Sequence, residues 1–135
     1  MVAYARISQN RIRCRSIIIE PDVVVVFDPK LPLIVDVFQG LKDNGVIILN
    51  SSCNEVKCIY KTYCVDANRI AKELGLVLAG WPLVNTSMLG AVLKATGLFD
   101  IKYLLESVKE YIRGNILEHN IKAVEEAYNS TCEVC

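Results

Sequence analysis

A chain of 135 residues, 53% of them hydrophobic, is long enough to bury one core, and we expect residues 1–135 to form a single domain. The 15 basic and 15 acidic residues cancel, which excludes an overall field that would hold the protein on nucleic acid or on an anionic membrane. The mean hydropathy of +0.33 is high for a free monomer and favours a sheet buried on both faces, a permanent protein interface, or both.

The sequence contains neither a membrane span nor a secretion signal. Its most apolar early stretch, residues 17–27, is broken by Glu20, Pro21 and Asp22. The N-terminus lacks the basic and apolar regions of a signal peptide. We therefore expect a cytoplasmic protein without membrane contacts, whose six cysteines are thiols in the first place.

The first predicted element is a β-hairpin, because residues 2–7 and 12–19 flank a short polar turn. Arg11, Arg13 and Arg15 have period-two spacing and would share one face of its second strand. Such a row can bind phosphates or carboxylates, and it can equally be a solvated face that prevents edge-to-edge aggregation. Arg13 and Arg15 are the first candidate binding residues.

A βαβ unit follows the hairpin. The β-branched run at residues 23–27 predicts a strand buried on both faces. Pro32 suits the first turn of a helix that ends at the turn before Gly45, with Gly45 in the left-handed conformation. Residues 46–49 predict a second strand, which makes the sheet parallel.

A third strand is expected near residues 59–65, followed by a helix. Asp66 is a good N-cap for this helix, and Gly75 closes it. Residues 76–79 predict one more short strand.

The next helix runs to Gly97 and carries the second candidate site. Asn85 or Thr86 is expected to cap it, and the free backbone N–H groups of its first turn could bind an anion. The alternative is that Asn85 and Thr86 only cap the helix and bind no ligand. Small residues such as Gly90 would let this helix approach the sheet closely.

Two further helices complete the C-terminal third. Asp100 caps the first of them, and Asn115 with Glu118 resembles a capping box that opens the second. The predicted fold is therefore an α/β, Rossmann-like fold: a mostly parallel sheet flanked by helices, with an N-terminal β-hairpin and a helical C-terminal third.

The cysteines do not predict a metal site. Cys53, Cys58 and Cys64 have separations that fit no standard zinc or iron–sulfur spacing. Cys132 and Cys135 form a C-x-x-C at the end of the chain, where a redox-active or disulfide pair is possible. A structural metal would need two further ligands there, so no metal ligand is predicted.

No catalytic residue is predicted either. The sequence shows no nucleophile and base placed by a recognisable motif. None of the seven glycines forms a G-x-G-x-x-G or Walker pattern, so the chain has no recognisable phosphate-binding loop.

The order of several short segments resembles the gamma subunit, or gamma domain, of the 2-oxoacid:ferredoxin oxidoreductases, most closely the pyruvate branch. The resemblance covers residues 2–128, nearly the whole chain. Its landmarks are AYARI at 3–7, IRCRS at 12–16, EPD at 20–22, FDP at 27–29, GLKD at 40–43, GVIILN at 45–50, VNTSMLGA at 84–91, ATG at 95–97 and NIKAVEEAY at 120–128.

The sequence departs from the family pattern at its N-terminus. Family members begin with a strand, a glycine-rich loop and a helix, whereas this chain begins at the hairpin. The resemblance therefore implies an N-terminally truncated domain whose exposed sheet edge is covered by a subunit contact.

The resemblance implies a subunit of a thiamine-dependent enzyme that converts pyruvate and coenzyme A to acetyl-CoA and CO2 and reduces ferredoxin. The complex would hold thiamine diphosphate, Mg and iron–sulfur clusters on its alpha, beta and delta subunits. This chain would support assembly, bind no cofactor alone, be inactive alone, and handle coenzyme A through Arg13 and Arg15, or through Asn85 and Thr86.

Three alternatives remain open at this point. The substrate could be another 2-oxoacid, such as 2-oxoglutarate or a branched-chain acid. The chain could also be a stand-alone Rossmann-like module for an adenine-containing cofactor, or a purely structural interaction protein.

Overall fold

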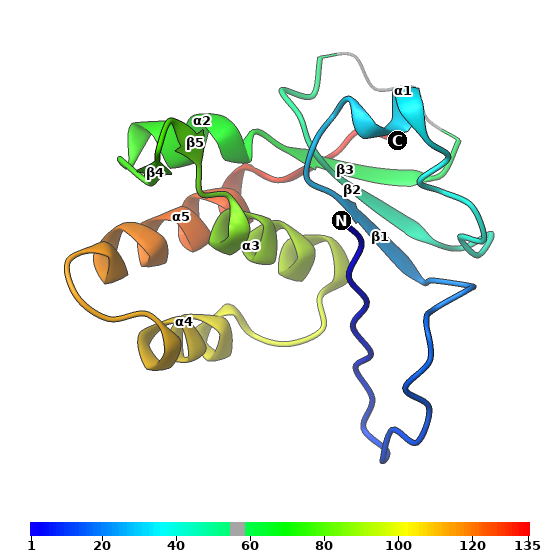
Figure 1. The fold of residues 1–135 in the computed structure, drawn as a ribbon. Helices are drawn as coiled ribbons and strands as arrows, with labels where there is room; N and C mark the ends of the chain where they lie inside the picture. The colour runs from blue at the N-terminus through cyan, green and yellow to red at the C-terminus, as the bar shows by residue number, and fades with distance from the viewer. Residues whose placement is uncertain (55–58) are drawn as a thin grey trace.

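The computed structural model describes residues 1–54 and 59–135, and its centre is a four-stranded sheet in the order β1-β2-β3-β6 (Figure 1). Strands β1, β2 and β3 are parallel, with Val46 of β2 opposite Val23 of β1 and Lys61 of β3, and β6 is antiparallel to β3. The strands are β1 Val23–Val26, β2 Val46–Asn50, β3 Lys61–Val65 and β6 Cys132–Glu133. The predicted mostly parallel sheet is confirmed.

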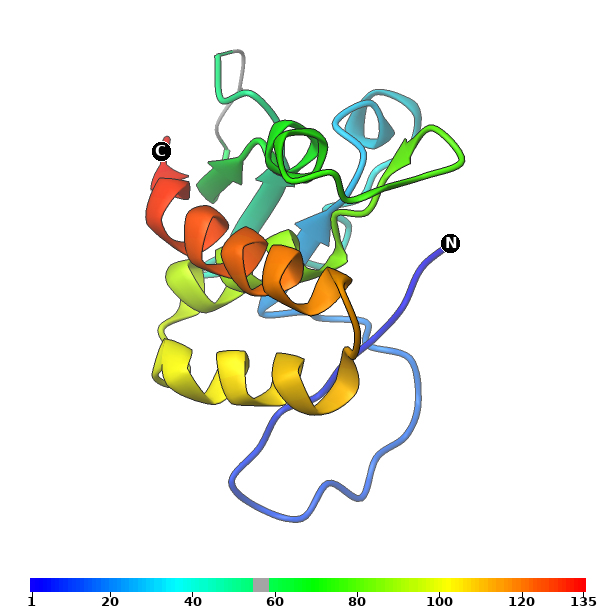
Figure 2. The same cartoon turned by 90° about the vertical axis from the view of Figure 1, so that its left-hand side faces the viewer.

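Helices pack against one face of this sheet and form the C-terminal part of the fold. Figures 1 and 2 show α3 and α5 side by side next to the strands, with α4 outside them. Ile48, Val65 and Met88 lie in the main core between sheet and helices. The helices are α2 Ala67–Glu73, α3 Asn85–Thr96, α4 Ile101–Tyr111 and α5 Ile116–Ser130. None of the helices among the described residues is long and apolar enough to cross a membrane.

Most of the local helix signals are confirmed. The carboxylate of Asp66 accepts a hydrogen bond from the backbone N–H of Arg69 at 2.9 Å, and Asp100 caps α4 in the same way. Gly97 ends α3 in the left-handed conformation with φ 62°. The prediction of a capping box at Asn115 is wrong. Asn115 does precede the first residue of α5, but its side chain makes no capping hydrogen bond.

The helix after β1 is much shorter than predicted. Helix α1 spans only Leu31–Ile34, and Val35 is already extended. Asp36 accepts a hydrogen bond from the N–H of Phe38 at 3.2 Å, a turn that competes with helix formation. The glycine with positive φ in this segment is Gly40, at +80°, rather than Gly45. The helix therefore ends well before the predicted turn at Gly45.

The N-terminal segment folds back on itself as predicted but forms no strand ladder. Residues 1–22 project from the domain as two arms (Figure 1), and none of them is in a strand. Arg6 links the arms by donating to the carbonyl oxygens of Ser16 at 2.6 Å and Ile17 at 3.3 Å. The hairpin shape is therefore present, but side-chain bonds replace strand pairing.

The remaining short strands were partly missed. Strand β4, Val77–Leu78, lies within the predicted range 76–79, but it pairs with β5, Trp81–Pro82, in a separate two-stranded sheet. Strand β6 was not predicted, because two residues carry no periodicity.

Helices α3 and α5 approach each other closely along a parallel seam. A Cβ added to Gly90 would lie 2.5 Å from the carbonyl oxygen of Val124, so only glycine fits there. One turn earlier, Thr86 donates to the side-chain oxygen of Asn120 at 2.8 Å. The small residue at position 90 therefore serves the contact with α5 rather than the predicted contact with the sheet.

Asn50 joins three elements at the carboxyl ends of the parallel strands. Its side chain is 1% exposed; it donates to the carbonyl oxygen of Phe27 at 2.9 Å and accepts from the N–H of Ala67 at 3.0 Å. These bonds tie the end of β1 and the start of α2 to the end of β2. Burial of an amide is tolerated here because its polar atoms have partners.

We expect Gly90→Ala to lower the free energy of unfolding by about 1–3 kcal/mol, because the methyl group must push α3 and α5 apart. Urea unfolding followed by circular dichroism measures this change. The matched control is Ser107→Ala on the exposed side of α4, which should stay within about 0.5 kcal/mol of wild type. Equal stability of the two variants would contradict the close seam.

We expect Asn50→Ala to cost about 2–4 kcal/mol, because it leaves a buried N–H of Ala67 and a carbonyl of Phe27 without partners. The same unfolding measurement applies, with exposed Asn129→Ala as the control. A loss as small as that of the control would show that Asn50 does not hold these elements together.

Candidate functional site

The predicted arginines lie on the exposed N-terminal arms. Arg13 and Arg15 are exposed, and neither forms an ion pair with a carboxylate among the described residues. Arg15 lines an open hollow between the arms together with Arg6 and Tyr4. The guanidinium groups of Arg13 and Arg15 are thus available to an anion or a partner, but no ladder aligns them on one strand face.

The second predicted pair lies in the first turn of α3. The cap position is Val84, and no side chain caps the helix, so the predicted capping role of Asn85 or Thr86 is wrong. Asn85 is exposed, whereas the Thr86 hydroxyl is buried in its bond to Asn120. Ser87, in the same turn, is fully buried, and its hydroxyl has no hydrogen-bond partner among the described residues. Of the pair, Asn85 alone keeps its side chain available.

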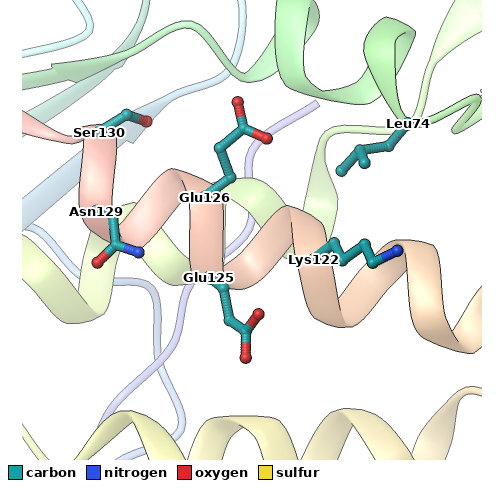
Figure 3. Close-up of a pocket in the computed structure, with 6 residues that line it drawn as sticks. All are labelled: Leu74, Lys122, Glu125, Glu126, Asn129 and Ser130. Carbon is teal, nitrogen blue, oxygen red and sulfur yellow. The ribbon is translucent and has the colours of Figure 1, made fainter.

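The two predicted pairs do not converge on one pocket. The hollow that Arg15 lines includes no residue of α3. A different hollow lies between α2 and α5 and is lined by Leu74, Lys122, Glu125, Glu126, Asn129 and Ser130 (Figure 3). Figure 3 shows Glu125 and Glu126 pointing away from each other, so they do not form a carboxylate pair for acid–base chemistry.

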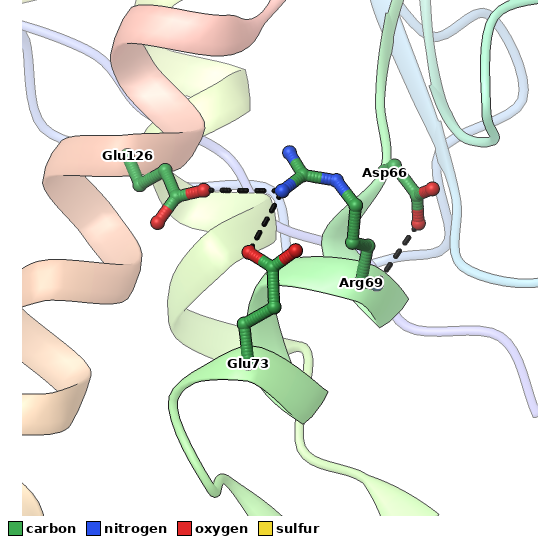
Figure 4. Close-up of polar contacts among 4 residues, drawn as sticks. All are labelled: Asp66, Arg69, Glu73 and Glu126. Carbon is green, nitrogen blue, oxygen red and sulfur yellow. Dashed lines mark hydrogen bonds and ion pairs between the residues drawn. The ribbon is translucent and has the colours of Figure 1, made fainter.

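An ion-pair group lies beside this second hollow. The Arg69 guanidinium contacts Glu73 at 2.8 Å and Glu126 at 3.4 Å, which links α2 to α5 (Figure 4). The hydrogen bond to Glu73 raises the pKa of Arg69 above its usual value, and the charge of Glu73 adds to this effect. Because two carboxylates neutralise this cation, Arg69 is a structural link rather than an anion-binding residue.

The described residues hold no catalytic pair. Within residues 1–54 and 59–132, no hydrogen bond joins a serine, threonine or cysteine side chain to a histidine, lysine or carboxylate. Nucleophilic catalysis needs such a base within hydrogen-bond reach. No such pair is present among these hydrogen bonds.

Two apolar surfaces are exposed instead. The α1 surface consists of Leu33, Ile34 and Val35, of which Leu33 is 84% and Ile34 78% exposed. The β4–β5 tip carries Leu78, 67% exposed, and Trp81, 77% exposed. Exposed clusters of large apolar side chains mark protein interfaces. The high hydropathy of the sequence already indicated such an interface, although it did not locate it.

The fold also gathers cysteines that are far apart in sequence. Cys53 and Cys64 are joined by a disulfide, and the Sγ of Cys132 lies 3.9 Å from that of Cys64 and 4.0 Å from that of Cys53. Cys58 lies outside the described residues. The sequence missed this cluster because Cys132 reaches it only through the pairing of β6 with β3.

Known proteins with similar sequences are subunits of one class of oxidoreductase. Residues 1–130 match the family described as pyruvate ferredoxin/flavodoxin oxidoreductase. The chain is 43% identical over 138 residues to the pyruvate/ketoisovalerate oxidoreductases common subunit gamma of Thermococcus kodakarensis, across 97% of this chain and 72% of that relative. It is 38% identical to the pyruvate synthase subunit PorC of Methanocaldococcus jannaschii, across 96% of this chain and 70% of that relative.

A solved structure shares the fold. The crystal structure of pyruvate oxidoreductase subunit PORC from Thermotoga maritima matches with a TM-score of 0.70 and 25% identity, over 85% of this chain and 66% of that chain. The chain thus spans about two thirds of the length of these relatives. It belongs to the pyruvate ferredoxin/flavodoxin oxidoreductase family, as its sequence landmarks indicated, and its relatives are gamma-type (PorC) subunits of oxidoreductase complexes.

Proposed function

We propose that this chain is the gamma subunit of a cytoplasmic, thiamine-dependent pyruvate:ferredoxin oxidoreductase and that its main task is to hold that complex together. The observation that carries the proposal is the exposure of the α1 surface and the β4–β5 tip on a chain whose described residues hold no catalytic pair. Permanent interfaces bury large apolar side chains of this kind.

The proposed complex converts pyruvate and coenzyme A to acetyl-CoA and CO2 and transfers two electrons to ferredoxin. Thiamine diphosphate with Mg would supply the carbanion chemistry, and iron–sulfur clusters would carry the electrons, all on the alpha, beta and delta subunits. The relative from Thermococcus kodakarensis is named as common to pyruvate and ketoisovalerate oxidoreductases, which supports a branched-chain 2-oxoacid as a second substrate class.

This chain would contribute to coenzyme A binding through Arg13 and Arg15. Both guanidinium groups are exposed and without a carboxylate partner among the described residues, and coenzyme A carries phosphate groups that such groups bind well. Asn85 and Thr86 are the second choice. Because the Thr86 hydroxyl is bonded to Asn120, that site would rest on Asn85 and the free backbone N–H groups of the first turn of α3.

We expect the double variant Leu33→Glu/Ile34→Glu to fold normally and to lose assembly. Both side chains are exposed in the isolated chain, so the variant should stay within about 0.5 kcal/mol of wild type. In the complex, two buried carboxylates would oppose association. The measurement is anaerobic co-purification with the alpha, beta and delta subunits, followed by pyruvate-dependent reduction of ferredoxin.

The control adds the same charge at exposed polar positions, as Asn44→Glu/Ser107→Glu. If the Leu33/Ile34 variant assembles and turns over like this control, the α1 surface is not an interface. If the wild-type chain recovers no partner but binds an adenine nucleotide as a monomer, the stand-alone cofactor module replaces the subunit proposal.

We expect Arg13→Ala/Arg15→Ala to raise the Kd of the assembled enzyme for coenzyme A by about 10- to 100-fold, because two charge-assisted hydrogen bonds are lost. Isothermal titration of the assembled complex measures this change. Arg11→Ala, on the same arm, is the matched control. An unchanged Kd in the double variant would remove the arginines from the proposed coenzyme A site.

A further inference from the structure

Three sulfur atoms from distant parts of the chain meet at one end of the sheet. Cys53 follows the end of β2, Cys64 lies in β3, and Cys132 opens β6. Their Sγ atoms all lie within 4.8 Å of one another. Cys64 and Cys132 are direct partners in the β3–β6 register, so the backbone itself fixes two of the three positions.

The spacing around Cys132 fits a shared metal ion. Thiolate sulfurs lie about 2.3 Å from Zn²⁺, and two sulfurs of one tetrahedral site are therefore about 3.8 Å apart. The Cys132 Sγ is 3.9 Å from that of Cys64 and 4.0 Å from that of Cys53. Both distances match an edge of such a tetrahedron, and the third edge, between Cys53 and Cys64, can form only when their disulfide is reduced.

The same two distances argue against thiol–disulfide exchange as the purpose of the cluster. An attacking thiolate approaches along the S–S axis, so it should be about 2 Å farther from the leaving sulfur than from the attacked one. Cys132 is instead almost equally far from both sulfurs of the Cys53–Cys64 disulfide. It faces the bond from the side, as a third ligand around a common centre would.

We propose that Cys53, Cys64 and Cys132, once the disulfide is reduced, form a binding site for a single Zn²⁺ ion. A dithiol breaks the Cys53–Cys64 bond by giving two electrons and two protons to the sulfurs, and is itself oxidised to its disulfide. Binding of Zn²⁺ then releases one proton from each of the three thiols. The fourth position takes water.

Such a site would anchor the C-terminus to the sheet. Strand β6 has only two residues, which is short for an edge strand. A metal bound by β3, β6 and the segment after β2 cross-links all three. The Cys53–Cys64 disulfide does not include Cys132, so ligation of the metal is what adds Cys132 of β6 to this cross-link.

The test uses the whole chain, reduced with dithiothreitol without oxygen, freed of the reductant by gel filtration, and titrated with Zn²⁺ and separately with Co²⁺. We expect one Zn²⁺ per chain, an intense thiolate-to-Co²⁺ charge-transfer band, and a rise of Tm with Zn²⁺. Cys132→Ser should weaken Zn²⁺ binding by at least about 10-fold and lose part of the charge-transfer band. Its side chain is exposed, so this substitution should not prevent folding.

The matched control is Cys14→Ser, which removes an exposed free thiol far from the cluster in sequence. Hydrogen bonding to Ser16 lowers the pKa of Cys14, which favours its thiolate and makes this exposed thiol a suitable control for nonspecific metal binding. The proposal is overturned if reduced wild type takes up no stoichiometric Zn²⁺, or if Cys132→Ser binds it as tightly as Cys14→Ser. Peptide mapping that finds a Cys64–Cys132 disulfide without metal uptake would overturn it as well.

Discussion

The close contact between α3 and α5 is the constraint on which the rest of the fold depends. At Gly90 the backbones of the two helices meet with no room for a Cβ, and one turn away the Thr86–Asn120 hydrogen bond sets their register. Ala91 of α3 and Ala127 of α5 are both fully buried in the core. Because α5 is held there, its last turn ends beside the sheet, and the chain continues directly into β6 at the edge of β3.

The same packing engages polar groups beside the sheet in internal contacts. Polar groups at the carboxyl ends of the strands, where α/β proteins commonly bind ligands, are used internally. Asn50 bonds the end of β1 and the start of α2, and Arg69 is neutralised by carboxylates of α2 and α5. The α1 surface and the β4–β5 tip expose large apolar side chains of the kind that mark protein interfaces.

Prediction from sequence succeeded where the signal was local. Helix ends could be predicted at Asp66, Asp100 and Gly97, because each of these residues acts within one turn of its own helix. It failed where two local signals competed, as at α1, where Asp36 formed a turn within an apolar stretch. The candidate site was predictable only in part. The exposure of Arg13 and Arg15 agrees with the expectation of a solvated segment. The hydrogen bond that occupies the Thr86 hydroxyl could not be predicted, because its acceptor, Asn120, lies 34 positions away in the sequence.

The sequence by itself determined the parallel strands and the order of the helices, because these follow from residue patterns that span a few turns. It indicated the family through the order of the landmark segments along the chain. The expected burial of the first strand on both faces is wrong, because β1 lies at the edge of the sheet and three of its four residues are only half-buried. Only the tertiary structure decided that Gly90 faces α5, that α1 presents its apolar side chains to solvent, and that Cys53, Cys64 and Cys132 meet. Cys64 and Cys132 are 68 residues apart, and a two-residue antiparallel pairing joins them. Contacts of this kind leave no periodic trace in a single sequence, because they arise only when separate elements dock.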